Sequence, residues 1–100
     1  MCKHIILWQL KDELTAEQKA AVKADMKESL TALVGQIPGL LEVKVQTEGL
    51  PSSNADVMLY TVFETVADLK VYATHPAHVA VADAKVRPFS KMRLCLDFEE

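Results

Sequence analysis

The chain has 100 residues, of which half are hydrophobic and a quarter are charged, and its formal net charge is −3. A chain of this length can bury about 65 % of its unfolded surface, which is enough for one hydrophobic core but not for two domains. The composition excludes disordered, collagenous and low-complexity proteins. The acidic balance argues against nucleic acid as a partner. We therefore expect a single globular domain over residues 1–100.

The two cysteines, Cys2 and Cys95, are too few for a disulfide framework. The apolar run at residues 5–8 is too short for a signal peptide, and no run reaches the length of a membrane span. We expect a cytoplasmic protein with reduced thiols and without a membrane partner.

Residues 3–10 form the first element, and their β-branched and aromatic composition predicts a strand. Alternate side chains of a strand share a face. One face therefore carries His4, Ile6, Trp8 and Leu10, and the other carries Ile5, Leu7 and Gln9.

A helix should begin after Thr15, because Thr15 and Gln18 have the spacing of a capping box. Apolar residues then recur at helical spacing, and Gly35 and Pro38 mark the end of the helix. These apolar residues, which we expect in the core, are Val22, Met26, Leu30, Leu33 and Val34.

Residues 41–46 alternate between apolar and polar side chains, which predicts a half-buried strand with Leu41, Val43 and Val45 on its apolar side. Residues 47–55 are rich in Gly, Pro, Ser and Asn and should form a loop. A third strand, apolar on both faces, is expected at residues 57–63.

Thr65 should cap a second helix over residues 66–73, which ends because Pro76 restricts the residue before it. Pro76 suits the first position of a third helix, expected to run to about Lys85. Residues 92–98 predict the last strand. One face of that strand carries Met92, Leu94, Leu96 and Phe98.

This order of elements is that of an α+β, ferredoxin-like fold, a four-stranded antiparallel sheet with helices on one face. Helices cover only one face of such a sheet, yet the first, third and fourth strands look apolar on both faces. A second apolar face needs a partner, and another copy of the chain is the simplest one. We predict a homodimer through the sheet face. The alternative is that the third helix and the loop at residues 47–55 cover part of it.

Several stretches of the sequence resemble the stress-responsive α/β-barrel (Dabb) domain family. They are residues 3–7 (KHIIL), 36–39 (QIPG), 96–98 (LDF) and, most specific, 72–79 (YATHPAHV). The resemblance covers the whole chain, residues 1–100. It implies a dimeric α/β barrel, in which two ferredoxin-like sheets meet as a barrel-like core and each protomer keeps a pocket between its sheet and its helices.

The resemblance also implies a chemistry for the pocket. Most members have no assigned activity, some plant members are induced by stress, and one type is a cofactor-free cyclase that closes a poly-β-keto chain by aldol condensation. In that type the histidine matching His78 is the base, the tyrosine matching Tyr72 supports it, and the position matching His4 lines the pocket. This chain departs from the cyclase at residues 55–57, which lack a tyrosine and a histidine, and at Trp8, which replaces a smaller aliphatic residue and should reshape the cavity.

His78 should lie in the first turn of the third helix, where the positive end of the helix dipole lowers the pKa of its imidazole. A neutral imidazole is what a general base requires. Tyr72 precedes the helix break by two residues and can face the same pocket. The alternative is that His75 and His78 only satisfy backbone groups at the helix junction, which is the role we expect for His75.

The remaining residues that we expect to bind substrate share a position on the inner side of the first strand, the first helix or the third strand. They are His4, Ile6, Trp8, Met26, Leu30 and Leu59. For His4 the alternative is a hydrogen-bonded core histidine, and for Met26 and Leu30 it is a place in the core.

We expect no metal and no cofactor. Donor side chains occur at Cys2, His4, His75, His78 and Asp83, but Pro76 breaks the geometry of the histidine pair and no zinc-type spacing is present. Cys95 should be a buried, inert thiol.

Together these features predict a Dabb-type homodimer whose apolar pocket binds a small hydrophobic molecule of keto or aromatic type. If the protein is an enzyme, the expected reaction is cofactor-free proton transfer by His78. A non-catalytic stress-response dimer is the first alternative, and a relative of the ferredoxin-like monooxygenases is the second.

Overall fold

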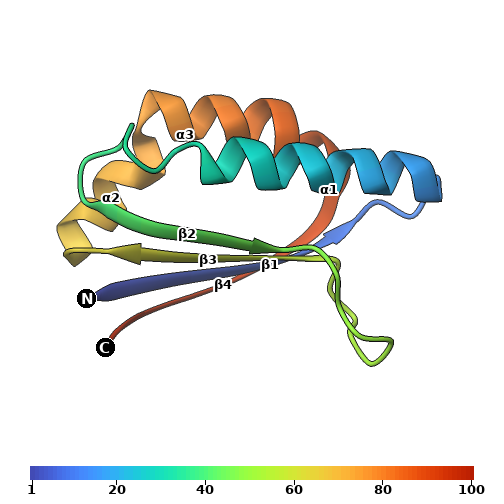
Figure 1. Ribbon diagram of the computed structural model, residues 1–100, viewed down its shortest axis with the longest axis horizontal. Helices are drawn as coiled ribbons and strands as arrows, with labels where there is room; N and C mark the ends of the chain where they lie inside the picture. The colour runs from blue at the N-terminus through green and yellow to red at the C-terminus, as the bar shows by residue number, and fades with distance from the viewer.

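The computed structural model describes all residues from 1 to 100. The elements follow one another as β1 (Cys2–Leu10), α1 (Ala16–Thr31), β2 (Leu40–Gln46), β3 (Val57–Phe63), α2 (Val66–Thr74), α3 (Pro76–Val81) and β4 (Ser90–Glu99). Between α3 and β4 the chain passes through a π-helical turn at Ala82–Val86 and a 3₁₀ turn at Arg87–Phe89. The helices form one layer above the sheet, and the two termini lie side by side (Figure 1).

The four strands form one antiparallel sheet in the order β2-β3-β1-β4. This topology confirms the predicted α+β, ferredoxin-like fold with helices on one face. None of the helices has the length and apolar composition that a bilayer crossing requires.

Side chains at the helix ends determine where α1, α2 and α3 begin. Thr15 and Gln18 form the predicted capping box of α1, and Thr65 forms a second one with Asp68 at the start of α2. His75 lies between α2 and α3, and its Nδ1 accepts a hydrogen bond from the Ala77 N–H at 3.1 Å. The prediction that His75 caps the helix junction is confirmed.

The core lies between the inner face of the sheet and α1. On β1 the alternation is as predicted, because Cys2, His4, Ile6, Trp8 and Leu10 are all buried on the helix side. Thr61, the buried hydroxyl opposite His4 on β3, donates a hydrogen bond to the His4 carbonyl at 2.8 Å. This hydrogen bond gives the buried Thr61 hydroxyl a partner and joins β3 to β1 within the core.

Two predictions about buried aliphatic residues are wrong. Val34 was expected in the core, but α1 ends at Thr31, and Val34 lies in the turn that follows and is exposed. Leu41 was expected on the same face as Val43 and Val45. A bulge between Leu40 and Glu42 makes Leu41 an extra residue without a partner on β3, and its side chain is exposed.

The predictions for the C-terminal segment also need correction. The third helix is shorter than expected, since α3 ends at Val81 and the π-helical turn carries the chain onward. β4 is not apolar on both faces: its inner face carries Arg93, Cys95 and Asp97, opposite Trp8, Ile6 and His4 of β1. Cys95 is exposed, not buried. β4 lies at the edge of the sheet, and the main helix contacts are with the other three strands.

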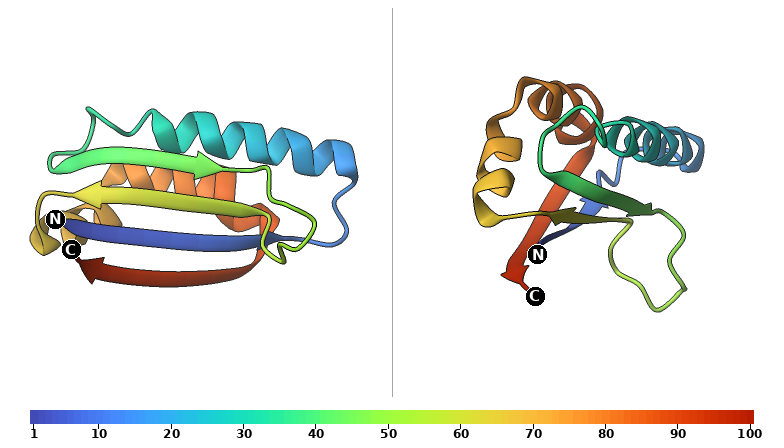
Figure 2. Two further views of the ribbon diagram at one scale, coloured as in Figure 1. Left: turned by 60° about the horizontal axis from the view of Figure 1, so that its bottom comes forward. Right: turned by 60° about the vertical axis from the view of Figure 1, so that its left-hand side comes forward.

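The opposite side of the sheet is apolar, and no helix lies over it (Figure 2). We call the outward side chains of β3, β1 and β4 the open face. The apolar ones are Met58, Tyr60, Val62, Ile5, Leu7, Met92, Leu94, Leu96 and Phe98, and β1 adds the polar Lys3 and Gln9 near its two ends. On β2 the corresponding residues are polar, namely Glu42, Lys44 and Gln46. The third helix packs on the other side of the sheet, so this half of the alternative is wrong. The loop between β2 and β3 does project on the open side, at one end of the sheet (Figure 1).

We expect Met26→Ala to lower the free energy of unfolding by about 2–5 kcal/mol, because Met26 is fully buried and its removal leaves a cavity in the core. Val34→Ala is the matched control, and its change should be within about 0.5 kcal/mol because Val34 is exposed. Urea unfolding followed by circular dichroism measures both. Equal effects would contradict the assignment of Met26 to the core.

We also expect Gly39→Ala to destabilise the fold more than Gly35→Ala. Both glycines have positive φ, +82° and +89°, so alanine costs each of them about 1–2 kcal/mol. At Gly39 an added Cβ would also collide with Asp68, which caps α2, whereas at Gly35 the space is open. The added cost at Gly39 should be about 0.5–2 kcal/mol, the value of a lost cap. Thermal unfolding of the two variants tests this order.

Candidate functional site

A cavity of about 900 Å³ lies between β1 and β4 on one side and α2, α3 and the π-helical turn on the other. Its volume is in the range of small-molecule sites. The wall includes five of the six residues predicted to bind substrate: His4, Ile6, Trp8, Leu30 and Leu59. Met26 is not part of it, because its side chain lies fully buried in the core beside the cavity wall. Trp8 lines the cavity and does not close it.

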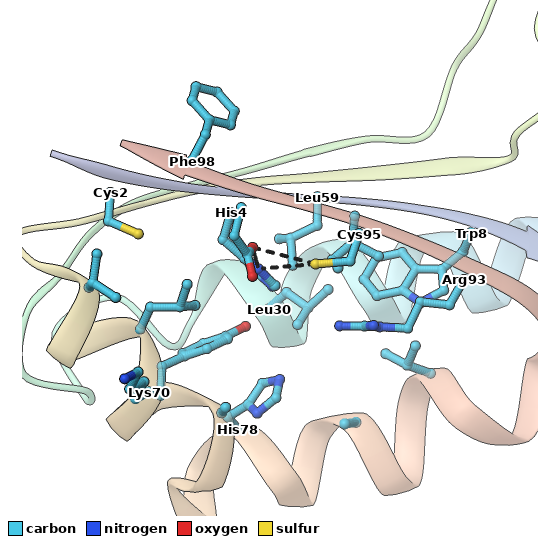
Figure 3. A pocket seen from close by; sticks show the side chains of 18 of the residues that line it. Cys2, His4, Trp8, Leu30, Leu59, Lys70, His78, Arg93, Cys95 and Phe98 are labelled. Atoms are coloured by element: carbon cyan, nitrogen blue, oxygen red, sulfur yellow. Dashed lines mark hydrogen bonds and ion pairs between the residues drawn. The ribbon is translucent and has the colours of Figure 1, made fainter. Parts of the chain in front are cut away.

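Tyr72 of α2 and His78 of α3 both line this cavity, and their rings lie 4.1 Å apart between centroids. The break at His75–Pro76 turns the chain, so that a residue on α2 and a residue on α3 face the same space. The His78 ring projects from α3 into the space beneath β1 and β4 (Figure 3). The Tyr72 hydroxyl and His78 Nδ1 are buried, and neither has a hydrogen-bond partner in the protein.

Burial shifts the pKa of each group in the direction that favours its neutral form. It raises the pKa of Tyr72 to about 12, and the charge of Arg93 works in the opposite direction. It also lowers the pKa of His78 below 6.5, against a smaller opposing effect of the Ala73 carbonyl. The predicted direction for His78 is therefore correct, but burial is its main cause in place of the helix dipole. Both groups are neutral near pH 7.

His4 lies on the sheet side of the cavity, with its ring centroid 6.0 Å from that of Tyr72. Its Nδ1 makes a short hydrogen bond to the Asp97 carboxylate of β4. Because a carboxylate accepts, this bond leaves the proton on Nδ1 and fixes the orientation of the ring. His4 is thus both a bonded core histidine and a wall residue, which combines the two interpretations of the sequence.

Cys95 lies next to this pair. Its Sγ is 3.8 Å from His4 Nδ1 and 3.4 Å from Asp97 Oδ1. Partial desolvation and then the Asp97 carboxylate raise the pKa of the thiol, which keeps it protonated and unreactive near pH 7. The expectation of an inert thiol thus holds chemically, although the residue is exposed.

His4, Cys95 and Asp97 are also the residues best placed to hold a metal ion, since their donor atoms all lie within 4.8 Å of one another. Of the five donors weighed from the sequence, only His4 belongs to this group. His75 is used as a helix cap, and Asp83 pairs with Arg87 on the 3₁₀ turn.

The charged residues of the cavity are ones that sequence reasoning missed. Arg93, Asp97 and Glu99 line it from β4, and Lys70 and Arg87 line it from the helical side. Arg93, Cys95 and Asp97 alternate with the apolar residues of the open face, and this alternation was the available signal. The prediction did not use it because it treated β4 as apolar on both faces.

The cavity opens to solvent between β4 and the helical side, where Lys70, Ala73 and Arg87 of its wall are exposed. Arg93, Cys95 and Asp97 line it and are nevertheless exposed, whereas the lining residues of β1 are buried. A ligand would thus enter past β4 and meet Tyr72 and His78 at the inner end.

Comparison with known proteins places this geometry in a family. The sequence profile of the stress-responsive A/B barrel domain matches residues 2–100. Olivetolic acid cyclase from Cannabis sativa is 30 % identical over 99 residues, which cover 96 % of this chain and 93 % of the cyclase.

Solved structures agree with this result. A dimeric protein of unknown function with a ferredoxin-like fold from Bacteroides fragilis NCTC 9343 is 34 % identical, with a TM-score of 0.91 over 99 % of this chain and 95 % of that one. A putative antibiotic biosynthesis monooxygenase from Nitrosomonas europaea has a TM-score of 0.76 over 100 % and 98 % of the two chains, but at 14 % identity it shares the fold alone. The profile match and the identity to the cyclase show that the chain belongs to the stress-responsive A/B barrel (Dabb) family.

Proposed function

We propose that this protein binds a small hydrophobic molecule of keto or aromatic type in its cavity, and that His78 acts on it as a cofactor-free general base. The observation that carries the proposal is the pair of buried, unpartnered polar atoms, the Tyr72 hydroxyl and His78 Nδ1. A buried polar atom without a partner costs about 1–3 kcal/mol. Two such atoms beside one cavity are explained if a ligand supplies the missing hydrogen bonds.

The electrostatics of the pair suit proton abstraction next to a carbonyl. Neutral His78 takes a proton from the carbon α to the carbonyl, and the electrons of the broken C–H bond move onto the carbonyl oxygen as an enolate. The Tyr72 hydroxyl, protonated because its pKa is about 12, donates a hydrogen bond to that oxygen. The enolate carbon then either takes the proton back from the His78 imidazolium or attacks a second carbonyl of the same substrate molecule. In the second case the new alkoxide takes the proton.

The likeness to olivetolic acid cyclase supports a keto substrate of this kind. The substrate of that cyclase is not carried over, because residues 55–57 and Trp8 differ from the cyclase pattern. The non-catalytic alternative, a stress-response dimer, assigns no chemistry to Tyr72 and His78. The monooxygenase alternative rests on a shared fold alone.

We further propose that the open face is the contact between two copies of the chain. Its outward leucines are largely exposed, with Leu94 at 59 % and Leu96 at 64 %. A contiguous apolar surface of this kind is typical of an interface. The 34 % identical protein from Bacteroides fragilis is described as dimeric, which supports the same assembly here.

The test measures deuterium exchange at the α-carbon of an aryl β-keto ester, such as ethyl benzoylacetate, after the rate in buffer alone has been subtracted. His78→Ala should lower this protein-catalysed rate by about 10²–10⁴-fold. Tyr72→Phe should lower it by about 10²–10³-fold, because it removes the hydrogen bond to the enolate. Exchange is followed by NMR. His75→Asn, which retains a capping side chain, is the control and should keep the parent rate. Unchanged exchange in His78→Ala would overturn the catalytic proposal and favour the non-catalytic dimer.

The pH profile of kcat/KM should reflect the lowered pKa of His78. The neutral form is the active one, so activity is present above the pKa of His78 and is lost as the pH falls through it. Because burial lowers that pKa, the midpoint of the decline should lie at a lower pH than the ordinary pKa of an imidazole. An NMR titration of the His78 ring protons provides an independent value. A midpoint at or above the ordinary pKa of an imidazole would contradict this assignment.

Leu96→Asp should convert a dimer into a monomer, because it places a charge within the open face. Val71→Asp is the matched control. Val71 is 51 % exposed but lies on α2, on the other side of the sheet, so this variant should remain dimeric. Analytical ultracentrifugation measures the mass, and far-UV circular dichroism checks the fold. A dimeric, folded Leu96→Asp protein would place the interface elsewhere.

A further inference from the structure

We propose that Arg93 makes the cavity selective for ligands that carry a carboxylate, so that the substrate is a keto acid and not a neutral ketone. This inference deepens the proposed function and rests on it. The proposed function requires only an apolar body and a carbonyl that reaches Tyr72 and His78. The structure adds a cation between that pair and the solvent.

The position of Arg93 is determined by the register of β4. Arg93 pairs with Trp8 of β1, so its side chain leaves the sheet on the inner face, two residues before Cys95. Figure 3 shows the Arg93 side chain below β4, on the same side of the sheet as His78 and Leu30. It therefore lies along the route by which a ligand would enter past β4.

The Arg93 guanidinium has no acidic partner in the protein. The ion pairs of the chain join His4 to Asp97, Lys44 to Glu42, Lys85 to Asp25, Arg87 to Asp83, and Lys91 to Asp12. Arg87, the other arginine of the wall, is thus neutralised by Asp83. Asp97, the acid nearest to Arg93 along the inner face of β4, is held by His4.

Lys70 is the other cation of the wall without an ion pair. It lies on α2, at the opposite end of the view in Figure 3 from Arg93. The positive charge of Arg93 acts on both functional groups, since it is one cause of the shifts at Tyr72 and at His78, whereas Lys70 contributes to neither. Arg87 also acts on His78, and more strongly than Arg93, but Arg87 is paired with Asp83. Among the cations of the wall that have no ion pair, Arg93 is therefore the one whose charge reaches Tyr72 and His78.

The chemistry of the guanidinium identifies the ligand group. Arginine binds a carboxylate with two parallel hydrogen bonds, and its planar fork is weakly hydrated and suited to partly buried sites. A ligand with its carbonyl at Tyr72 and His78 and its apolar body between Ile6, Trp8 and Leu59 would direct its free end toward β4. A carboxylate at that end supplies the missing partner of Arg93.

Binding of an acid and its neutral ester tests the inference. The probes are 4-oxo-4-phenylbutanoate and its methyl ester, which share the aryl ketone and differ in charge. Isothermal titration calorimetry at 50 mM salt should show that the parent binds the acid at least fivefold more tightly than the ester. In Arg93→Met the two affinities should agree within twofold, and Arg93→Lys should keep part of the preference because it keeps the charge but not the fork. Lys70→Met is the matched control and should keep the parent preference.

Each outcome separates this inference from the function on which it rests. If the parent binds acid and ester equally, the carboxylate preference is wrong and the keto-binding pocket stands. If Lys70→Met and not Arg93→Met abolishes the preference, the assignment to Arg93 is wrong. If the parent binds neither probe, and His78→Ala has no effect on exchange, the proposed function itself fails and the inference fails with it. A preserved circular dichroism spectrum confirms that each variant is folded.

Discussion

A four-stranded sheet with one layer of helices leaves one face and one edge uncovered, and the rest of this structure depends on that constraint. The helices pack mainly against β1, β2 and β3, and β4 is left at the edge. The uncovered face is apolar and requires another surface to bury it. The space under the uncovered edge becomes a cavity, because α2, α3 and the π-helical turn face β4 without filling the volume between them.

Two polar side chains of the cavity wall are neutral and have buried atoms without a hydrogen-bond partner. Tyr72 and His78 are brought together by the break at Pro76, and burial holds both in their uncharged forms. On the sheet side, polar groups are satisfied internally, since His4 bonds Asp97 and Thr61 bonds the His4 carbonyl. The unpaired hydrogen-bonding capacity is therefore concentrated on the helical wall. Arg93 adds a charge without an ion pair at the solvent side, so a ligand of the proposed class would find a binding group at each end.

Much of the fold follows from local signals that act within a few residues. The structure contains the predicted capping box at Thr15, the cap at Thr65, the helix break at Pro76 and the alternation of β1. The errors have a common physical origin. Val34 and Leu41 are apolar at the expected spacing, but an early helix end and a bulge move each to the surface. Neither event has a signature in the pattern of apolar residues, because both are set by how the chain reaches β2.

The candidate site divides in the same way. The sequence by itself determined that Tyr72 and His78 flank a helix break, that β1 offers His4, Ile6 and Trp8 on one face, and that the sheet has a second apolar face, because these follow from spacing, proline geometry and strand periodicity. Only the tertiary structure decided that Met26 lies outside the cavity, that Asp97 holds His4, and that Cys95 and Arg93 line the opening. These depend on the β1–β4 register and on which strand lies at the edge, and pairing between segments about 90 residues apart is settled only when the whole sheet forms.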